Sequence, residues 1–197
     1  HAPSWFGLGF LAFRQAEYLR AEDYFRQALR CQPDFVLALD YLAQACSLRE
    51  AWTEALQYWE RCAQLQPELR WHPKLTLYYQ KIQRWSEAYH HVQIWLAHAP
   101  DNADAHNEAG LILTQLRQPE AARQAFERAL ALAPQFAEVW TNLGRLAKSC
   151  GQMAAALDAY KQAVETRSDY AEGWYNLGVL YEENGDAPAA RYAVGRA

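Results

Sequence analysis

Residues 140–163, WTNLGRLAKSCGQMAAALDAYKQA, contain the pattern that decides the fold. Apolar and small residues recur there every three or four positions: Trp140, Leu143, Gly144 and Ala147 in the first half, then Ala156, Tyr160 and Ala163 in the second. This spacing is that of two successive amphipathic helices and not of a strand. We therefore expect a pair of helices joined by a short turn.

The same pattern recurs along the chain. Its first half matches residues 5–12 (WFGLGFLA) and 174–181 (WYNLGVLY), and its second half returns as small, aromatic and small residues at the same spacing: Ala21, Phe25 and Ala28; Ala55, Trp59 and Cys62; Ala122, Phe126 and Ala129. Four prolines that close successive blocks lie 34, 33 and 34 residues apart: Pro33, Pro67, Pro100 and Pro134. Each should end its second helix, because the residue before a proline disfavours the helical conformation.

Glycine recurs at one mid-helix place, where it costs about 1 kcal/mol relative to alanine. The glycines at this place are Gly9, Gly110, Gly144 and Gly178. We expect close approach of the partner helix, whose small residues would face the gap, to compensate for this cost. The tryptophan and aromatic places would then fill the wider spaces above and below.

A W-x₂-L-G-x₂-Y segment followed by A-x₃-F and a closing proline resembles the tetratricopeptide repeat (TPR) family. The resemblance covers essentially the whole chain and implies an all-α, right-handed superhelical solenoid of about six helix–turn–helix units. We expect one repeat domain over residues 1–197, with units at about 2–35, 36–68, 69–102, 103–136, 137–170 and an incomplete 171–197. The sequence starts and stops inside a repeat, so we expect a fragment of a longer protein.

Two units depart from the pattern. Unit three is one residue short and has Thr76 in the glycine place and Pro73 near its start, so its first helix should begin near His72 or Pro73. Unit five has Ser168 in the proline place, so its second helix should end less sharply. Aspartates near three helix starts are expected to cap free backbone N–H groups: Asp34, Asp101 and Asp169.

Three further groups of residues could carry chemistry. Five of the six histidines lie between His72 and His106, but their spacing lacks the one-turn separation of helical zinc ligands, which predicts solvated or core-packed side chains and no metal site. The four cysteines include no C-x-x-C pair and are expected to act as small buried hydrophobes. The aromatics of unit three, interleaved with Lys and Arg, are expected to fill the core, with a protein-binding patch as the alternative.

Composition restricts the function. The net charge is −4 and no polybasic run is present, which argues against nucleic acid and anionic membranes as partners. No apolar stretch approaches the roughly 20 residues needed to span a bilayer, so direct membrane insertion is not expected. Catalytic and cofactor-binding motifs are absent as well, so we expect neither an enzyme nor a cofactor.

The resemblance implies a protein-interaction scaffold that binds a peptide or partner segment on the concave face formed by the first helices. That face should include Phe6, Phe10, Phe13, Asp40, Tyr41, Gln44, Lys74, Leu77, Lys81, Asn107, Glu108, Leu111, Thr141, Asn142, Arg145, Tyr175, Asn176 and Val179. Packing of the three phenylalanines against missing sequence is an equal alternative. No Lys/Arg set matches the carboxylate clamp of chaperone-tail adaptors. Two other functions stay open: the non-catalytic TPR arm of an enzyme such as an O-GlcNAc-transferase-like glycosyltransferase, and self-association through exposed ends.

Overall fold

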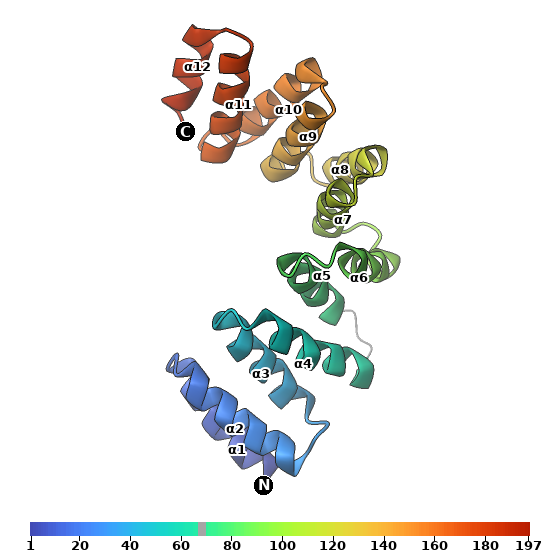
Figure 1. Ribbon diagram of the computed structural model, residues 1–197, viewed down its shortest axis with the longest axis vertical. Helices are drawn as coiled ribbons and strands as arrows, with labels where there is room; N and C mark the ends of the chain where they lie inside the picture. Colours follow the sequence, from blue (N-terminus) through green and yellow to red (C-terminus); the bar gives the residue numbers. More distant parts are fainter. Residues whose placement is uncertain (67–69) are drawn as a thin grey trace. The chain divides into compact units, whose positions relative to one another are not determined.

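The computed structural model describes residues 1–66 and 70–197 (Figure 1). Within these residues the chain forms twelve α-helices and no β-strand, which confirms the predicted all-α fold class. None of the described helices is long and apolar enough to cross a membrane.

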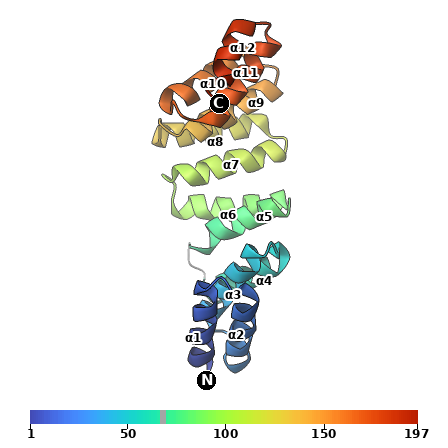
Figure 2. The ribbon, with the colours of Figure 1, turned by 90° about the vertical axis from the view of Figure 1, so that its left-hand side faces the viewer.

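The helices belong to two compact units, His1–His98 and Ala99–Ala197, which are called the first and the second unit. The names unit one to unit six are kept for the six repeats. The first unit contains α1 (Ala2–Arg14), α2 (Tyr18–Cys31), α3 (Val36–Leu48), α4 (Trp52–Leu65), α5 (Trp71–Lys81) and α6 (Trp85–His98). The second contains α7 (Ala103–Gln115), α8 (Pro119–Leu132), α9 (Ala137–Ser149), α10 (Met153–Thr166), α11 (Ala171–Glu183) and α12 (Ala187–Val194). Within each unit every helix packs on the next one in the chain, so that odd and even helices form antiparallel hairpins (Figures 1 and 2).

Each hairpin turns through a residue in the left-handed backbone region. Among the described residues, six have positive φ and recur at one place in each repeat: Ala16, Glu50, Gln83, Arg117, Gly151 and Gly185. The next N–H returns to a carbonyl five residues back, as in the bond of 2.9 Å from Gln152 N to Ala147 O. This is the closure of a Schellman motif, which satisfies carbonyls at the helix end. Four of the six turns hold this conformation without glycine.

An aromatic ring of the second helix faces the glycine of the first. A Cβ atom added to the glycine would lie 2.5–2.6 Å from the nearest ring carbons in three hairpins: Gly9–Phe25, Gly110–Phe126 and Gly144–Tyr160. The prediction of close approach at this place is therefore correct, but the predicted partner is wrong. The ring occupies the space above the glycine, where small residues were expected.

Unit three replaces this glycine–aromatic pair with two residues of similar size. Thr76 lies in the glycine place and Val92 in the aromatic place, and both are fully buried. Helix α5 begins at Trp71, one residue before the predicted start, and has Pro73 in its first turn. With 11 residues it is shorter than the 13-residue first helices of the neighbouring repeats.

The predicted aspartate caps are wrong. The N-cap residues of the three helices are Phe35, Asn102 and Tyr170, and only Asn102 accepts a cap hydrogen bond, from Ala105 N. Two of the aspartates accept instead from arginines 27 residues further along the chain: Asp34 from Arg61 and Asp101 from Arg128. Each carboxylate therefore links the turn before a first helix to the second helix of the same hairpin.

The prediction that α10 ends less sharply than the other second helices is also wrong. Its C-cap residue, Arg167, has φ −137° and ψ 100°, close to the values of Gln32 before Pro33 (φ −146°, ψ 94°). The extended C-cap therefore forms with Ser168 as it does with proline. The predicted role of Pro67 and the predicted boundary between units two and three lie outside the described residues.

In units four, five and six, the residue at the tryptophan position of the repeat pattern, on the first helix of the repeat, bonds back to the turn that precedes it. Three ring nitrogens contact the carbonyl oxygen six residues earlier: His106 Nε2 with Pro100 O (2.8 Å), Trp140 Nε1 with Pro134 O (3.0 Å) and Trp174 Nε1 with Ser168 O (2.8 Å). The acceptor is a backbone atom, so a serine there serves as well as a proline.

One buried carboxylate links α2 to the end of α3. Glu22 is 1% exposed and accepts from Arg26 Nη2 at 2.9 Å and from Arg49 Nη1 at 2.6 Å. Leucines stand at the equivalent place in units two and five, as Leu56 and Leu157. Unit one therefore buries a carboxylate where unit two buries a leucine and unit five half-buries one.

Candidate functional site

The predicted contact residues of α1 form an aromatic cluster with one residue of α3. The ring of Tyr41 lies 5.6, 5.4 and 5.4 Å from the rings of Phe6, Phe10 and Phe13. All four side chains are half-buried. The phenylalanines are thus partly covered by Tyr41, and each remains partly accessible to solvent.

Two of the predicted charged residues neutralise each other. The carboxylate of Asp40 accepts from Trp59 Nε1 at 2.8 Å and from Lys74 Nζ at 2.7 Å. Lys74 also lies 5.5 Å from the centre of the Trp59 ring, at a distance typical of a cation–π contact. Of the remaining predicted residues of the first unit, Gln44 is half-buried, Leu77 is 48% exposed and Lys81 is exposed.

In the second unit, Asn142 is held by an amide–amide hydrogen bond. Its Nδ2 donates to Asn107 Oδ1 at 3.0 Å, which links α9 to α7. Asn107 is only 8% exposed and Thr141 only 1%, so these two predicted residues contribute little accessible surface. Of the other predicted residues, Glu108, Leu111, Asn176 and Val179 are half-buried, whereas Arg145 and Tyr175 are exposed.

Two adjoining hollows bring several predicted residues together. Leu111, Asn142 and Arg145 line a hollow of about 230 Å³, and Arg145 also lines a second hollow of about 440 Å³ with Asn176. Ser149 lines both, so the two hollows form one trough across α7, α9 and α11, which we call the amide trough. Arg145 Nη1 lies 4.0 Å from Glu172 Oε1, an exposed and weak pairing.

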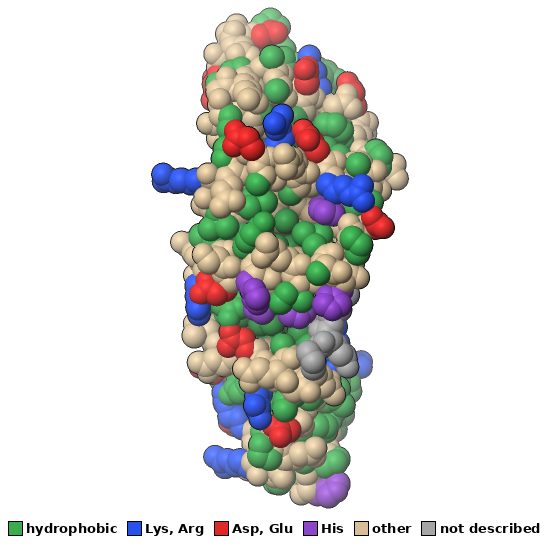
Figure 3. All heavy atoms as spheres, turned by 90° about the vertical axis from the view of Figure 1, so that its right-hand side faces the viewer, with side chains coloured by type: hydrophobic (Ala, Val, Ile, Leu, Met, Phe, Trp, Pro, Cys, Tyr) green, Lys and Arg blue, Asp and Glu red, His purple; other side chains and the backbone are tan. Residues whose placement is uncertain are grey.

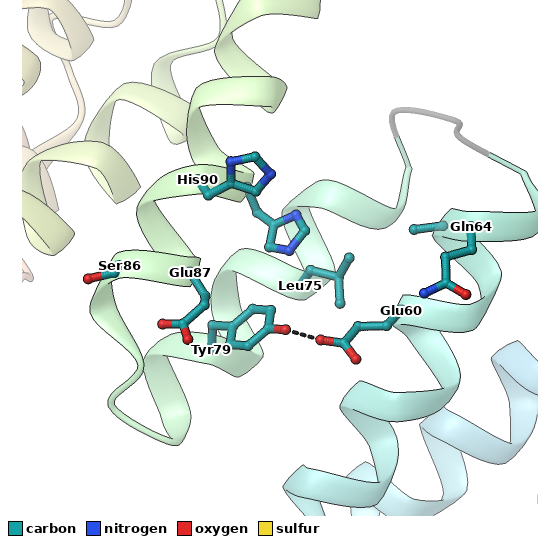
Figure 4. A pocket seen from close by; sticks show the side chains of 9 residues that line it. Glu60, Gln64, Leu75, Tyr79, Ser86, Glu87 and His90 are labelled. Carbon is teal, nitrogen blue, oxygen red and sulfur yellow. Dashed lines mark hydrogen bonds between the residues drawn. The ribbon is translucent and has the colours of Figure 1, made fainter.

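A third hollow, of about 580 Å³, was not predicted from the sequence. It lies in the first unit, with α5 below it and α4 and α6 on its two sides (Figure 4). Tyr79 donates a hydrogen bond across it to Glu60. The aromatic and histidine content of this region is visible in the sequence, but no spacing rule shows that a hollow lies above α5 between α4 and α6.

The neighbouring histidines are in mutual contact. His72 Nδ1 lies 3.1 Å from His91 Nδ1, so one ring donates and the other accepts. Burial lowers the pKa of His91 to about 4, with smaller effects from His72 and His90, and burial also lowers the pKa of His72. Histidine side chains are also exposed together on one face of this unit (Figure 3). In the described part of the chain, no group of three or more His, Cys, Asp or Glu could hold a metal ion.

The cysteines confirm their prediction in part. Cys46 and Cys62 are fully buried, and burial raises the pKa of each thiol to about 12. Cys31 and Cys150 are exposed instead, so they do not act as core hydrophobes.

Comparison with known proteins agrees with the repeat geometry. Models of the tetratricopeptide repeat match residues 2–35, 103–136 and 125–158, and a TPR repeat model matches residues 144–185. The chain belongs to the TPR family. A search of curated proteins found no significant match.

Solved TPR structures resemble this chain closely in fold and weakly in sequence. A TPR protein from Parabacteroides merdae superposes with a TM-score of 0.87 at 15% identity, over 99% of this chain and 78% of that one. MamA from Desulfovibrio magneticus gives 0.78 at 18% identity, over 86% and 96%. YrrB, described as a TPR protein with an unusual peptide-binding site, gives 0.63 at 20% identity, over 87% and 89%. At these identities the likeness concerns the fold alone.

TPR membership supports the general assignment of this chain as a protein-interaction scaffold. The described residues form a pure TPR fold, and such repeats typically serve without catalysis.

Proposed function

We propose that this TPR chain binds an extended peptide segment of a partner protein in the amide trough. The observation that carries the proposal is the convergence of Asn142, Arg145 and Asn176 on two adjoining hollows. Their side chains come from two different helices, α9 and α11, so one ligand would bridge two repeats. The half-buried aromatic cluster around Tyr41 would supply a second, apolar contact surface in the first unit.

The chemistry of the trough fits a peptide backbone. A carboxamide carries two donors and an acceptor oxygen, so it can bond both the carbonyl and the N–H of an extended chain. Asn142 uses one donor on Asn107, which fixes the orientation of its amide and leaves the second donor and the acceptor for a ligand. Leu111 offers an apolar contact, and the exposed Arg145 favours an acidic side chain.

The test is selection of binding peptides from a random twelve-residue library, followed by calorimetry. Asn142→Ala and Arg145→Ala should each weaken the selected peptides by roughly tenfold, as loss of one hydrogen bond to a constrained or charged group implies. Gln124→Ala, at an exposed place on α8, is the matched control and should leave affinity unchanged. Equal affinity for all four proteins would show that the trough is not the binding site.

The same trough suits the second candidate function, the partner-recruiting TPR arm of a glycosyltransferase-like enzyme. Asn142 and Asn176 are the residues that favour it, because they fall where such arms carry inward asparagines and both line the trough. A transferase domain encoded in the same gene would establish this alternative, and a gene without one would remove it.

A further inference from the structure

The hollow above α5 has a mixed lining with an acidic character. Its floor consists of Leu75 and Tyr79, which are 0% and 4% exposed. Glu60 and Gln64 form the α4 side, and Ser86, Glu87 and His90 form the α6 side (Figure 4). Its volume, about 580 Å³, is within the range of pockets that hold small ligands or several side chains.

The two carboxylates differ in their neighbours. Glu87 is paired with Arg84, whose Nε donates to Oε1 at 2.7 Å. Glu60 accepts from the buried hydroxyl of Tyr79, which occupies one of its two oxygens and orients the group. Of the residues that the structure describes, no lysine or arginine lines the hollow, and Arg84 neutralises only one of its two carboxylates. His91, on the same helix as Glu87, is uncharged at neutral pH because burial lowers its pKa to about 4. One negative charge therefore remains, on Glu60.

An apolar floor below a single oriented carboxylate matches the chemistry of a basic side chain. The methylene stem of lysine or arginine packs on apolar surface while its head group donates to a carboxylate. Gln64 and Ser86 add neutral acceptors on opposite sides of the same space. An anionic ligand would meet Glu60 unshielded, and a purely apolar ligand would leave its carboxylate desolvated, which costs free energy.

We propose that the hollow above α5 binds a lysine or arginine side chain presented by a partner protein, with Glu60 as the charged acceptor. The site lies within the first unit and shares no residue with the amide trough. It would give the chain a second, independent contact site, which prefers a basic side chain where the amide trough prefers an acidic one. The proposal does not rest on the proposed function and can fail or hold without it.

The test uses an array of ten-residue acetylated peptides, each with one central arginine, paired with otherwise identical peptides in which citrulline replaces it. Citrulline keeps the shape of arginine and removes its charge. The 197-residue chain should prefer the arginine member of its best pairs by roughly tenfold. Glu60→Gln should reduce that preference to about twofold or less, because the amide carries no charge. Ser86→Trp, at an exposed place, should abolish binding by filling the hollow.

Two controls make the outcome specific. Glu127→Gln removes an exposed carboxylate from α8 in the second unit and should leave the preference unchanged, as should Asn142→Ala in the amide trough. Melting curves by circular dichroism establish that each variant is folded. The proposal is overturned if no pair distinguishes arginine from citrulline, if the preference survives both Glu60→Gln and Ser86→Trp, or if Asn142→Ala removes it.

Discussion

The ring of Tyr160 lies directly against Gly144, so close that a Cβ atom on the glycine would stand 2.6 Å from the ring carbon Cε1. Tyr160 is 1% exposed, so the ring is packed within the core. Glycine is thus required here by packing, even though it weakens the helix that contains it.

Gly144→Ala should therefore destabilise the protein by about 1–3 kcal/mol, the usual cost of overpacking a filled site. Gly7→Ala is the matched control, because it is also a helical glycine and a Cβ there would meet nothing within 4 Å. That substitution should stabilise the chain by about 0.5–1 kcal/mol. Denaturant unfolding measures both, and equal changes of the same sign would refute the packing argument.

In unit three, Thr76 and Val92 match each other in size, and this can be tested by restoring the glycine–aromatic pair of the other hairpins. Val92→Phe alone should cost about 1–3 kcal/mol, because the ring would meet the threonine side chain. The double variant Thr76→Gly/Val92→Phe recreates the glycine–aromatic pair of the other hairpins and should recover part of that loss. A double-mutant cycle from unfolding free energies gives the coupling, and strict additivity would mean that the two places do not compensate each other.

The left-handed turns predict opposite effects for removing a glycine in one repeat and introducing one at the same place in another. Gly151 has φ +75°, so Gly151→Ala should destabilise by about 1 kcal/mol. Arg117 holds the equivalent place at φ +57°, and Arg117→Gly should be neutral to stabilising, by up to about 1 kcal/mol. Thermal unfolding of the two variants decides this, and marked destabilisation by Arg117→Gly would show that its side chain contributes more than its backbone strain costs.

His91 should make stability depend on pH below neutrality. Burial holds its folded-state pKa at about 4, below the ordinary value of 6.5. Between these two values the unfolded chain binds a proton that the folded chain does not, so this contribution is full above pH 6.5 and is lost as pH falls toward 4. The loss should be about 2 kcal/mol after solvent screening. His91→Ala should flatten this slope, whereas His98→Ala, at an exposed histidine, should not.

The ring-to-carbonyl bonds predict equal losses at two different joints. Trp140→Phe and Trp174→Phe each remove one hydrogen bond to a backbone oxygen, and each should cost about 0.5–1.5 kcal/mol. One acceptor belongs to a proline and the other to Ser168, yet both are main-chain atoms. A much larger loss at one joint, measured by chemical denaturation, would mean that the acceptor residue matters.

The sequence predicts what depends on local periodicity. Apolar spacing located the helices, and the recurrent glycines located the close approach within each hairpin. Even the late start of α5 follows from Pro73, because proline is tolerated only in a first turn. Each of these features is determined by residues within one repeat.

Features that depend on distant residues could not be predicted in this way. Asp34 stands near a helix start but pairs with Arg61, 27 residues away, because that arginine reaches it from the neighbouring helix. The hollow above α5 depends on which side chains of α4 and α6 face each other, and no spacing rule specifies that. The exposed Cys31 and Cys150 show the same limit, since burial depends on the neighbouring helix as well as on residue type.

The buried carboxylate of Glu22 has a consequence for the evolution of the array. Of its two arginines, Arg26 lies on the same helix and Arg49 is the C-cap residue of α3, in the next repeat. Among the described first helices of the repeats, α3 alone has an arginine at its C-cap. In a shuffled chain, unit one could precede a unit other than unit two. Glu22 would then be buried without Arg49, which is strongly unfavourable. Units that look interchangeable by motif therefore have a required neighbour, and recombination or duplication that separated units one and two would be selected against.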